Sequence, residues 1–138
     1  SVAYYKGVGL AADIGENIHI WGYSVQLKQL TSILLDNAIS HSPQGSPVEL
    51  VLREEKGKAI LSVINCGEEI PEEQRPYLFE RFYRGDAART GEKNHYGLGL
   101  AIAQAIAHSH KGSIRVRCGQ GKVEFCVKLP LQNRNRKN

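Results

Sequence analysis

The sequence predicts an α/β (α+β) two-layer sandwich, in which helices cover one face of a mixed, largely antiparallel sheet. Two segments with helical apolar spacing are each followed by a pair of short strand-like segments, and another strand-like segment opens the chain. Amphipathic helices and strands in this order bury their apolar surfaces together by packing as two layers. The first helical segment shows the spacing most clearly, with apolar residues at Leu27, Leu30, Ile33, Leu34, Ala38 and Ile39.

Cap and turn residues set the limits of the first elements. Ser24 can cap a helix that begins at Val25, and Ser42-Pro43 ends this helix because proline lacks the N–H that a helix needs. The charged segment 54–58 contains a glycine and separates two apolar runs, as expected for a turn between strands. The first half therefore predicts a β segment over 8–21, the helix from Val25, and strands over 48–53 and 59–64.

The second half repeats the pattern after a short helix that starts at Ile70, with a proline in its first turn. Residues 85–96 are polar without apolar periodicity and are expected to form a mobile loop. Gly97-Leu-Gly-Leu100 opens a second long helix that ends before Gly112. The last two strands are expected over 113–118 and 123–129, joined by the turn Gly119-Gln-Gly121.

Length and composition predict one domain, which we place at residues 1–131, followed by a flexible basic tail over 132–138. The net charge of +4 lies partly in that tail, and the absence of a basic stripe with interleaved aromatic residues argues against a nucleic-acid partner. No apolar run approaches the roughly 20 residues of a membrane-spanning helix. Three cysteines without CxxC spacing suit the reducing cytoplasm. Because the chain starts at Ser1 without methionine, we expect a fragment of a larger protein.

Two asparagines carry candidate binding chemistry. Asn37 lies inside the first helix beside its apolar face, and its amide oxygen could ligate Mg²⁺, which prefers oxygen ligands. Asn65 precedes Gly67 at a strand end, where a polar side chain could read a nucleobase edge. Taken alone, Asn37 fits a solvated helix position and the segment 65–67 fits a plain turn.

Cations and glycines make two further candidates. Arg84, Arg89, Lys93 and His95 lie in or beside the polar loop, which suits a cationic flap over phosphates and equally a solvated loop. Backbone N–H groups at the Gly97-Leu-Gly99 helix start can hold anionic oxygen, although such glycines also serve helix packing.

The order and spacing of these motifs resemble the catalytic domain of the histidine-kinase branch of the gyrase/Hsp90/histidine-kinase/MutL ATPase superfamily, with its Bergerat-type ATP-binding fold. The resemblance covers about residues 20–131. It rests on an N box around Asn37, a first glycine box Val63-Ile-Asn-Cys-Gly-Glu-Glu-Ile70, an F box Leu78-Phe-Glu-Arg-Phe-Tyr-Arg84 and a second glycine box Gly97-Leu-Gly-Leu-Ala-Ile102. The F box is its most specific part.

The resemblance implies a role for each matching residue. Asn37 becomes the catalytic Mg²⁺ ligand and Asn65 the adenine reader, while Phe79 and Phe82 pack the base of the flap. Arg84, Arg89 and Lys93 become phosphate contacts. The remaining residues implied at the ATP site are His41, Gly67, Ile70, Gly97, Leu98, Gly99 and Leu100.

The resemblance also implies the reaction and its partners. A sensor histidine kinase with ATP and Mg²⁺ as cofactors transfers the γ-phosphoryl group to a histidine on a separate dimerisation domain of the same parent protein. A response regulator then receives it. We expect a membrane-anchored parent with this domain in the cytoplasm. No histidine of this chain has the acceptor's setting, an exposed helical histidine followed by an acidic residue.

Several positions depart from the family pattern. Asn65 replaces the usual aspartate, Glu69 a second glycine, and Ser40 a frequent phosphate-binding cation. Ile33 stands where hydrolysing branches place a water-activating glutamate, which argues against an ATPase. These departures keep open a degenerate nucleotide-binding or regulatory module of the same fold. The F box speaks against another alternative, a serine kinase of the anti-sigma type.

Overall fold

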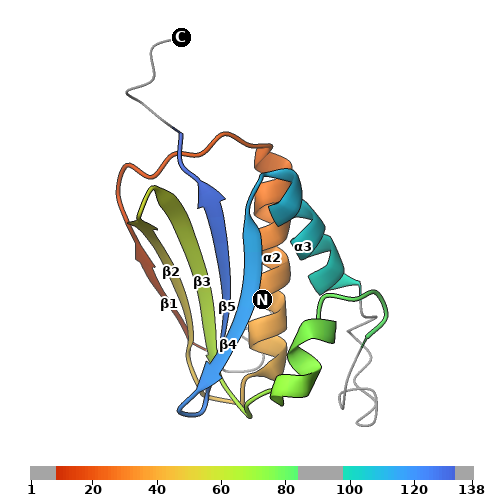
Figure 1. Ribbon diagram of the computed structural model, residues 1–138. Helices are drawn as coiled ribbons and strands as arrows, with labels where there is room; N and C mark the ends of the chain where they lie inside the picture. The colour runs from red at the N-terminus through yellow and green to blue at the C-terminus, as the bar shows by residue number, and fades with distance from the viewer. Residues whose placement is uncertain (1–8, 84–97, 133–138) are drawn as a thin grey trace.

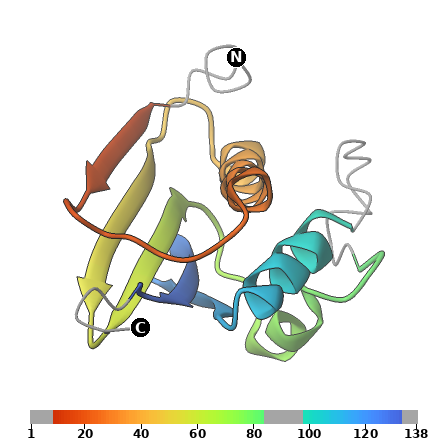
Figure 2. The same cartoon turned by 90° about the horizontal axis from the view of Figure 1, so that it is seen from above.

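The computed structural model describes residues 9–83 and 98–132, which form a five-stranded sheet covered on one face by helices (Figure 1). Seen from above, α2 and α3 lie on the same side of the sheet (Figure 2). The predicted two-layer sandwich is therefore confirmed. Its elements are β1 (Leu10–Ile14), α2 (Ser24–His41), β2 (Val48–Glu55), β3 (Lys58–Cys66), the 3₁₀ helix η1 (Glu72–Tyr77), α3 (Gly99–Ser109), β4 (Ser113–Gly119) and β5 (Lys122–Pro130).

The sheet is mixed and largely antiparallel, as predicted, with the strand order β1-β2-β3-β5-β4. Only β1 and β2 pair in parallel; β2–β3, β3–β5 and β4–β5 are antiparallel. Two-residue turns close both hairpins, with positive φ at Lys56 and Gly57 (51° and 77°) and at Gln120 and Gly121 (54° and 74°). This backbone matches the right-handed twist of the strands, so two residues are enough for each turn. The four hairpin strands are therefore longer, and the two turns shorter, than the sequence analysis predicts.

The core lies between the helices and the sheet. The predicted apolar face of α2 is confirmed, because Leu30, Leu34 and Ala38 are each no more than 1% exposed. They pack with buried residues of α3 and of the central strands, including Phe125, which is 2% exposed. Cys126 is buried, whereas Cys66 and Cys118 are partly exposed, and all three thiols are free.

The start of α2 differs from the prediction that Ser24 caps it. Ser24 is the first helical residue, Tyr23 occupies the cap position, and no side chain caps the helix. Instead, the Tyr23 N–H donates to Nε2 of His110 over 3.1 Å, and Nδ1 of His110 lies 2.8 Å from the Ile106 carbonyl. The His110 imidazole therefore fastens the beginning of α2 to the end of α3.

The segment after β3 holds the predicted F box. Its short helix is a 3₁₀ helix that begins at Glu72, two residues later than expected. Phe79 packs edge-on against Phe125 with ring centroids 6.1 Å apart, which places this residue in the core layer. Phe82 does not pack in the same way, because it is 69% exposed with a φ of 66°.

The expected loop over 85–96 and residues 133–138 of the tail expected over 132–138 lie outside the described residues. Among the residues that the structure describes, no helix is both long and apolar enough to span a bilayer.

Candidate functional site

One side of α2 carries the central candidate residue. Ile33, Asn37 and His41 follow one another at intervals of four residues, so they lie along one side of the helix over about 12 Å. Ile33 packs against the core, Asn37 is half-buried and His41 is exposed. The predicted magnesium ligand thus lies midway along this side of the helix.

The first glycine box reaches the His41 end of this side. A Cβ placed at Gly67 would lie 3.3 Å from the backbone oxygen of His41 and 3.3 Å from Nδ2 of Asn65. The Gly67 N–H donates to the Gly121 carbonyl over 3.0 Å, which ties the end of β3 to the β4–β5 hairpin. A glycine at this position therefore lets β3 end directly against the last turn of α2.

Asn65 lies at the end of β3 and is only 3% exposed. Its Nδ2 donates to the Cys66 carbonyl over 2.9 Å, and this bond distinguishes the amide nitrogen from the amide oxygen. None of residues 9–83 and 98–132 donates a hydrogen bond to Oδ1 of Asn65. The side chain therefore retains an acceptor, the group that a purine amino group requires.

The second glycine box begins α3 at the Ile33 end of the same side. A Cβ at Gly99 would lie 3.4 Å from Cγ2 of Ile33, an ordinary van der Waals distance. Leu98 is the cap residue, and no side chain caps the helix. The Ile102 N–H bonds to the Leu98 carbonyl. Within the described residues, 9–83 and 98–132, no side chain takes up the N–H groups of the first turn, which can therefore bind anionic oxygen.

The three apolar candidates, Ile70, Leu98 and Leu100, differ in how accessible their side chains are to a ligand. Ile70 and Leu100 pack against the core, and the Ile70 carbonyl accepts a 2.9 Å hydrogen bond from Nε of Arg75. Leu98 is 38% exposed. A ligand at this site would therefore meet the side chain of Leu98 and mainly the backbone of Leu100.

The structure brings two predicted segments, the end of β3 and the start of α3, to the part of α2 between Ile33 and His41, which contains Asn37. Four predicted ligand contacts, Arg84, Arg89, Lys93 and Gly97, lie outside the described residues. Glu69, which replaces a second glycine of the family pattern, is exposed.

Asn37 offers one neutral oxygen to a metal ion. In the described part of the chain, no three His, Cys, Asp or Glu side chains cluster as metal ligands. A cation held there would take its other ligands from phosphate oxygens and water, which is the usual manner of Mg²⁺. The residues present fit a magnesium ion that arrives with a phosphate ligand.

A pocket of about 130 Å³ lies elsewhere, on the sheet face opposite the helices, and contains none of the predicted residues. Arg53, Arg115 and Lys128 are among its lining residues. The sequence analysis did not identify this pocket. The alternating arginines of Ser113-Ile-Arg-Val-Arg117 were the available signal, because alternate residues of a strand share a face.

Comparisons with known proteins identify the family and the fold of the chain. Residues 22–133 match the family model described as histidine kinase-, DNA gyrase B- and HSP90-like ATPase. The sensor histidine kinase YkoH of Bacillus subtilis is 42% identical over 120 residues, which are 86% of this chain and 26% of that protein. The sensor histidine kinase RppB of Synechocystis is 36% identical over 126 residues, 90% of this chain and 28% of that protein.

Solved structures show the same fold. The mycobacterial sensor histidine kinase MprB matches with a TM-score of 0.84 and 28% identity, over 95% of this chain and 89% of that one. The catalytic domain of the histidine kinase ThkA matches with a TM-score of 0.81 and 24% identity, over 93% and 82% of the two chains. The chain spans less than a third of the length of the two curated relatives.

Proposed function

Because the chain belongs to the histidine kinase-, DNA gyrase B- and HSP90-like ATPase family, we propose that it binds ATP with Mg²⁺ and transfers the γ-phosphoryl group to a histidine of a separate domain. The observation that carries the proposal is the convergence of two glycine segments on one side of α2. Gly67 lies against the backbone of His41, Gly99 lies against Ile33, and Asn37 lies between these contacts.

Each end of this arrangement has its own chemistry. At the β3 end, the Oδ1 of Asn65 would accept a hydrogen bond from the purine amino group. At the α3 end, the N–H groups of the first turn and the helix dipole would bind phosphate oxygen. Asn37 would hold Mg²⁺ against the phosphates, where the ion neutralises charge during phosphoryl transfer.

The side of α2 also argues for transfer rather than hydrolysis. Ile33 occupies the position of the water-activating glutamate and packs against the core, so it supplies no general base. Neutral imidazole is already a nucleophile, so transfer to histidine depends on positioning and charge neutralisation. Arg84, Arg89 and Lys93 are proposed phosphate contacts because of the family resemblance.

The whole protein's role is part of the proposal. We infer that the acceptor histidine belongs to a dimerisation domain of the same parent, and that a response regulator receives the phosphoryl group. A neighbour at 22% identity, ThkA, was solved with its response regulator TrrA, and that likeness concerns the fold alone. The proposal also includes a membrane-anchored parent with this domain in the cytoplasm.

A degenerate nucleotide-binding or regulatory module of the same fold is the second candidate. The neutral side chain of Asn65 favours it, because a charged acceptor binds an amino group more strongly by about 1–2 kcal/mol. The two candidates differ in whether bound ATP reacts.

Calorimetric titration with a non-hydrolysable ATP analogue, with and without Mg²⁺, tests binding. Asn37→Ala should abolish the gain that Mg²⁺ gives, without lowering the melting temperature, because alanine is the better helix former. Gln29→Ala, an exposed change on the same helix, should leave the gain intact. Transfer of labelled phosphate to the parent's histidine domain tests the enzyme. Binding without transfer would support the second candidate, and no saturable binding at millimolar analogue would contradict the proposed function.

A further inference from the structure

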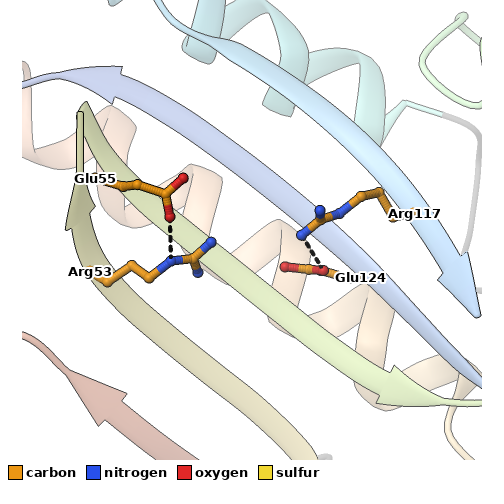
Figure 3. Close-up of polar contacts among 4 residues, drawn as sticks. All are labelled: Arg53, Glu55, Arg117 and Glu124. Carbon is orange, nitrogen blue, oxygen red and sulfur yellow. Dashed lines mark hydrogen bonds and ion pairs between the residues drawn. The ribbon is translucent and has the colours of Figure 1, made fainter. Parts of the chain in front are cut away.

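The face of the sheet turned away from α2 and α3 carries Arg53 and Glu55 of β2, Glu124 of β5 and Arg117 of β4 (Figure 3). The strand between β2 and β5, β3, adds Lys58, which is paired with Glu55. Residues paired across strands share a face, so the register arranges this surface in rows. The central rows are Arg53–Ile60–Lys128–Ser113, Val51–Ser62–Cys126–Arg115 and Glu49–Ile64–Glu124–Arg117.

Positive charge exceeds negative charge on these four strands. The four strands place three acidic side chains on this face, since Glu54, paired with Ala59, lies on the other face. Each of the three forms an ion pair: Arg53–Glu55 at 3.4 Å, Arg117–Glu124 at 2.8 Å and Lys122–Glu49 at 3.7 Å. In the part of the chain that the structure describes, no carboxylate pairs with the remaining cations, which are Lys58, Arg115 and Lys128. The edge strand β1 adds one acid to this face, Asp13, beside Val51.

The pocket of about 130 Å³ lies among these cations, lined by Arg53, Arg115, Arg117 and Lys128, with Glu55 as its acid. Below them the face is apolar or small. Ile60 is 2% exposed, Cys126 is 7% exposed, and Ser62 is 1% exposed with no hydrogen-bond partner for its hydroxyl among the described residues. These three residues are already covered, so the accessible surface of this face is formed mainly by the charged side chains, and arginine is enriched in protein interfaces.

The distance between the unpaired cations indicates an extended ligand with several negative charges. Lys58 and Arg115 lie two strands and four residues apart in the register, a backbone separation of roughly 16 Å. One phosphate ion is too small to meet both, whereas successive carboxylates of a peptide can. Single-stranded nucleic acid would need aromatic side chains for stacking, and the paired rows of these four strands contain none on this face.

We propose that this surface, the basic sheet face of Arg53, Lys58, Arg115, Arg117, Lys122 and Lys128, docks an acidic segment of a partner polypeptide. The partner's carboxylates meet the three unpaired cations and compete for the arginines, whose present ion pairs are exposed and therefore weak. The face lies on the opposite side of the sheet from Asn37 and Gly99. Docking therefore does not depend on nucleotide binding, and the proposal stands apart from the proposed function.

Fluorescence anisotropy of a labelled decaglutamate peptide tests the proposal, at an ionic strength below about 0.1 M, where the screening length exceeds about 10 Å. Arg115→Glu and Lys128→Glu should each weaken binding by about tenfold, since tenfold corresponds to about 1.4 kcal/mol. Lys28→Glu is the matched control, because it makes the same charge change at an exposed lysine on α2. It should change binding by less than about twofold.

The melting temperature of each variant shows that it is folded, and titration with the ATP analogue shows that the nucleotide site is unchanged. Three results would overturn the proposal: no saturable binding of decaglutamate, equal weakening in all three variants, or tighter binding of a labelled thymidine decanucleotide with the same dependence on Arg115 and Lys128. The second would mean attraction by net charge alone, and the third would identify a nucleic-acid surface.

Discussion

Asn65→Asp replaces the amide nitrogen of a buried side chain with an oxygen. It should weaken the hydrogen bond that Asn65 makes to Cys66 and strengthen the one that Asn65 is proposed to make to adenine. In the unliganded chain, Nδ2 of Asn65 donates to the Cys66 carbonyl over 2.9 Å. Aspartate places an oxygen there, so two acceptors face each other at a site where the residue is 3% exposed. In the nucleotide complex, the second oxygen becomes a charged acceptor for the purine amino group.

The two effects have opposite signs. Leaving a buried acceptor unpaired costs about 1–3 kcal/mol, and for a domain of this size each kcal/mol lowers the melting temperature by about 3–5 °C. The unliganded variant should therefore melt about 3–15 °C lower. A charged acceptor adds about 1–2 kcal/mol to the hydrogen bond with adenine, which corresponds to an affinity about 5–30 times higher.

Thermal melting by circular dichroism and calorimetric titration with the ATP analogue and Mg²⁺ measure both quantities. Asn17→Asp is the control, since Asn17 is exposed and its φ of 60° is tolerated by aspartate as well as by asparagine. It should change neither quantity appreciably. An Asn65→Asp variant that binds the analogue no better than the parent chain, or more weakly, would refute the placement of adenine at Asn65.

Three further predictions concern positions around the site. Gly99→Ala should leave the melting temperature unchanged or higher, because its methyl group meets only an ordinary contact and alanine favours helix, while calorimetry shows weaker nucleotide binding as phosphate can no longer approach as closely. His110→Ala should lower the free energy of unfolding in urea by about 2 kcal/mol, because it removes the hydrogen bond to the Tyr23 N–H before α2. The control His108→Ala, at an exposed position, should lower it by less than about 0.5 kcal/mol, and equal losses would contradict a stabilising role for the His110–Tyr23 bond. Phe79→Ala should cost about 2–4 kcal/mol in the same urea measurement because its ring packs edge-on in the core, whereas the exposed Phe82→Ala should cost little, and the reverse order would contradict this packing.

Local patterns were sufficient for the two layers and for most elements, although β1 (Leu10–Ile14) fills only part of the β segment predicted over 8–21. The spacing of Leu30, Leu34 and Ala38 predicted the buried face of α2, and the turn residues predicted both hairpins. These features depend on residues close together in the chain, so periodicity and turn chemistry reveal them. The candidate site residues were predicted by resemblance of motifs, and their roles stay predictions.

Contacts between distant residues were beyond local patterns. The expectation that Ser24 caps α2 was wrong, because the Tyr23 carbonyl accepts the first helical hydrogen bond, from the Leu27 N–H, and the cap position therefore falls one residue earlier. The contact of the Tyr23 N–H with His110, 87 positions away in the chain, was also not predictable from either segment alone. Likewise, no single segment shows that the two glycine boxes contact α2 at two separate points, Ile33 and His41.

The sequence by itself determined which surfaces are apolar, where the chain turns and which family its motifs resemble. Only the tertiary structure decided which side chains become neighbours. Lys58, Arg115 and Lys128 belong to three strands, and they share one face because the pairing register of β3, β5 and β4 aligns them. Register depends on burial across the whole sheet, so the charge of the open face follows from the packing of its apolar side.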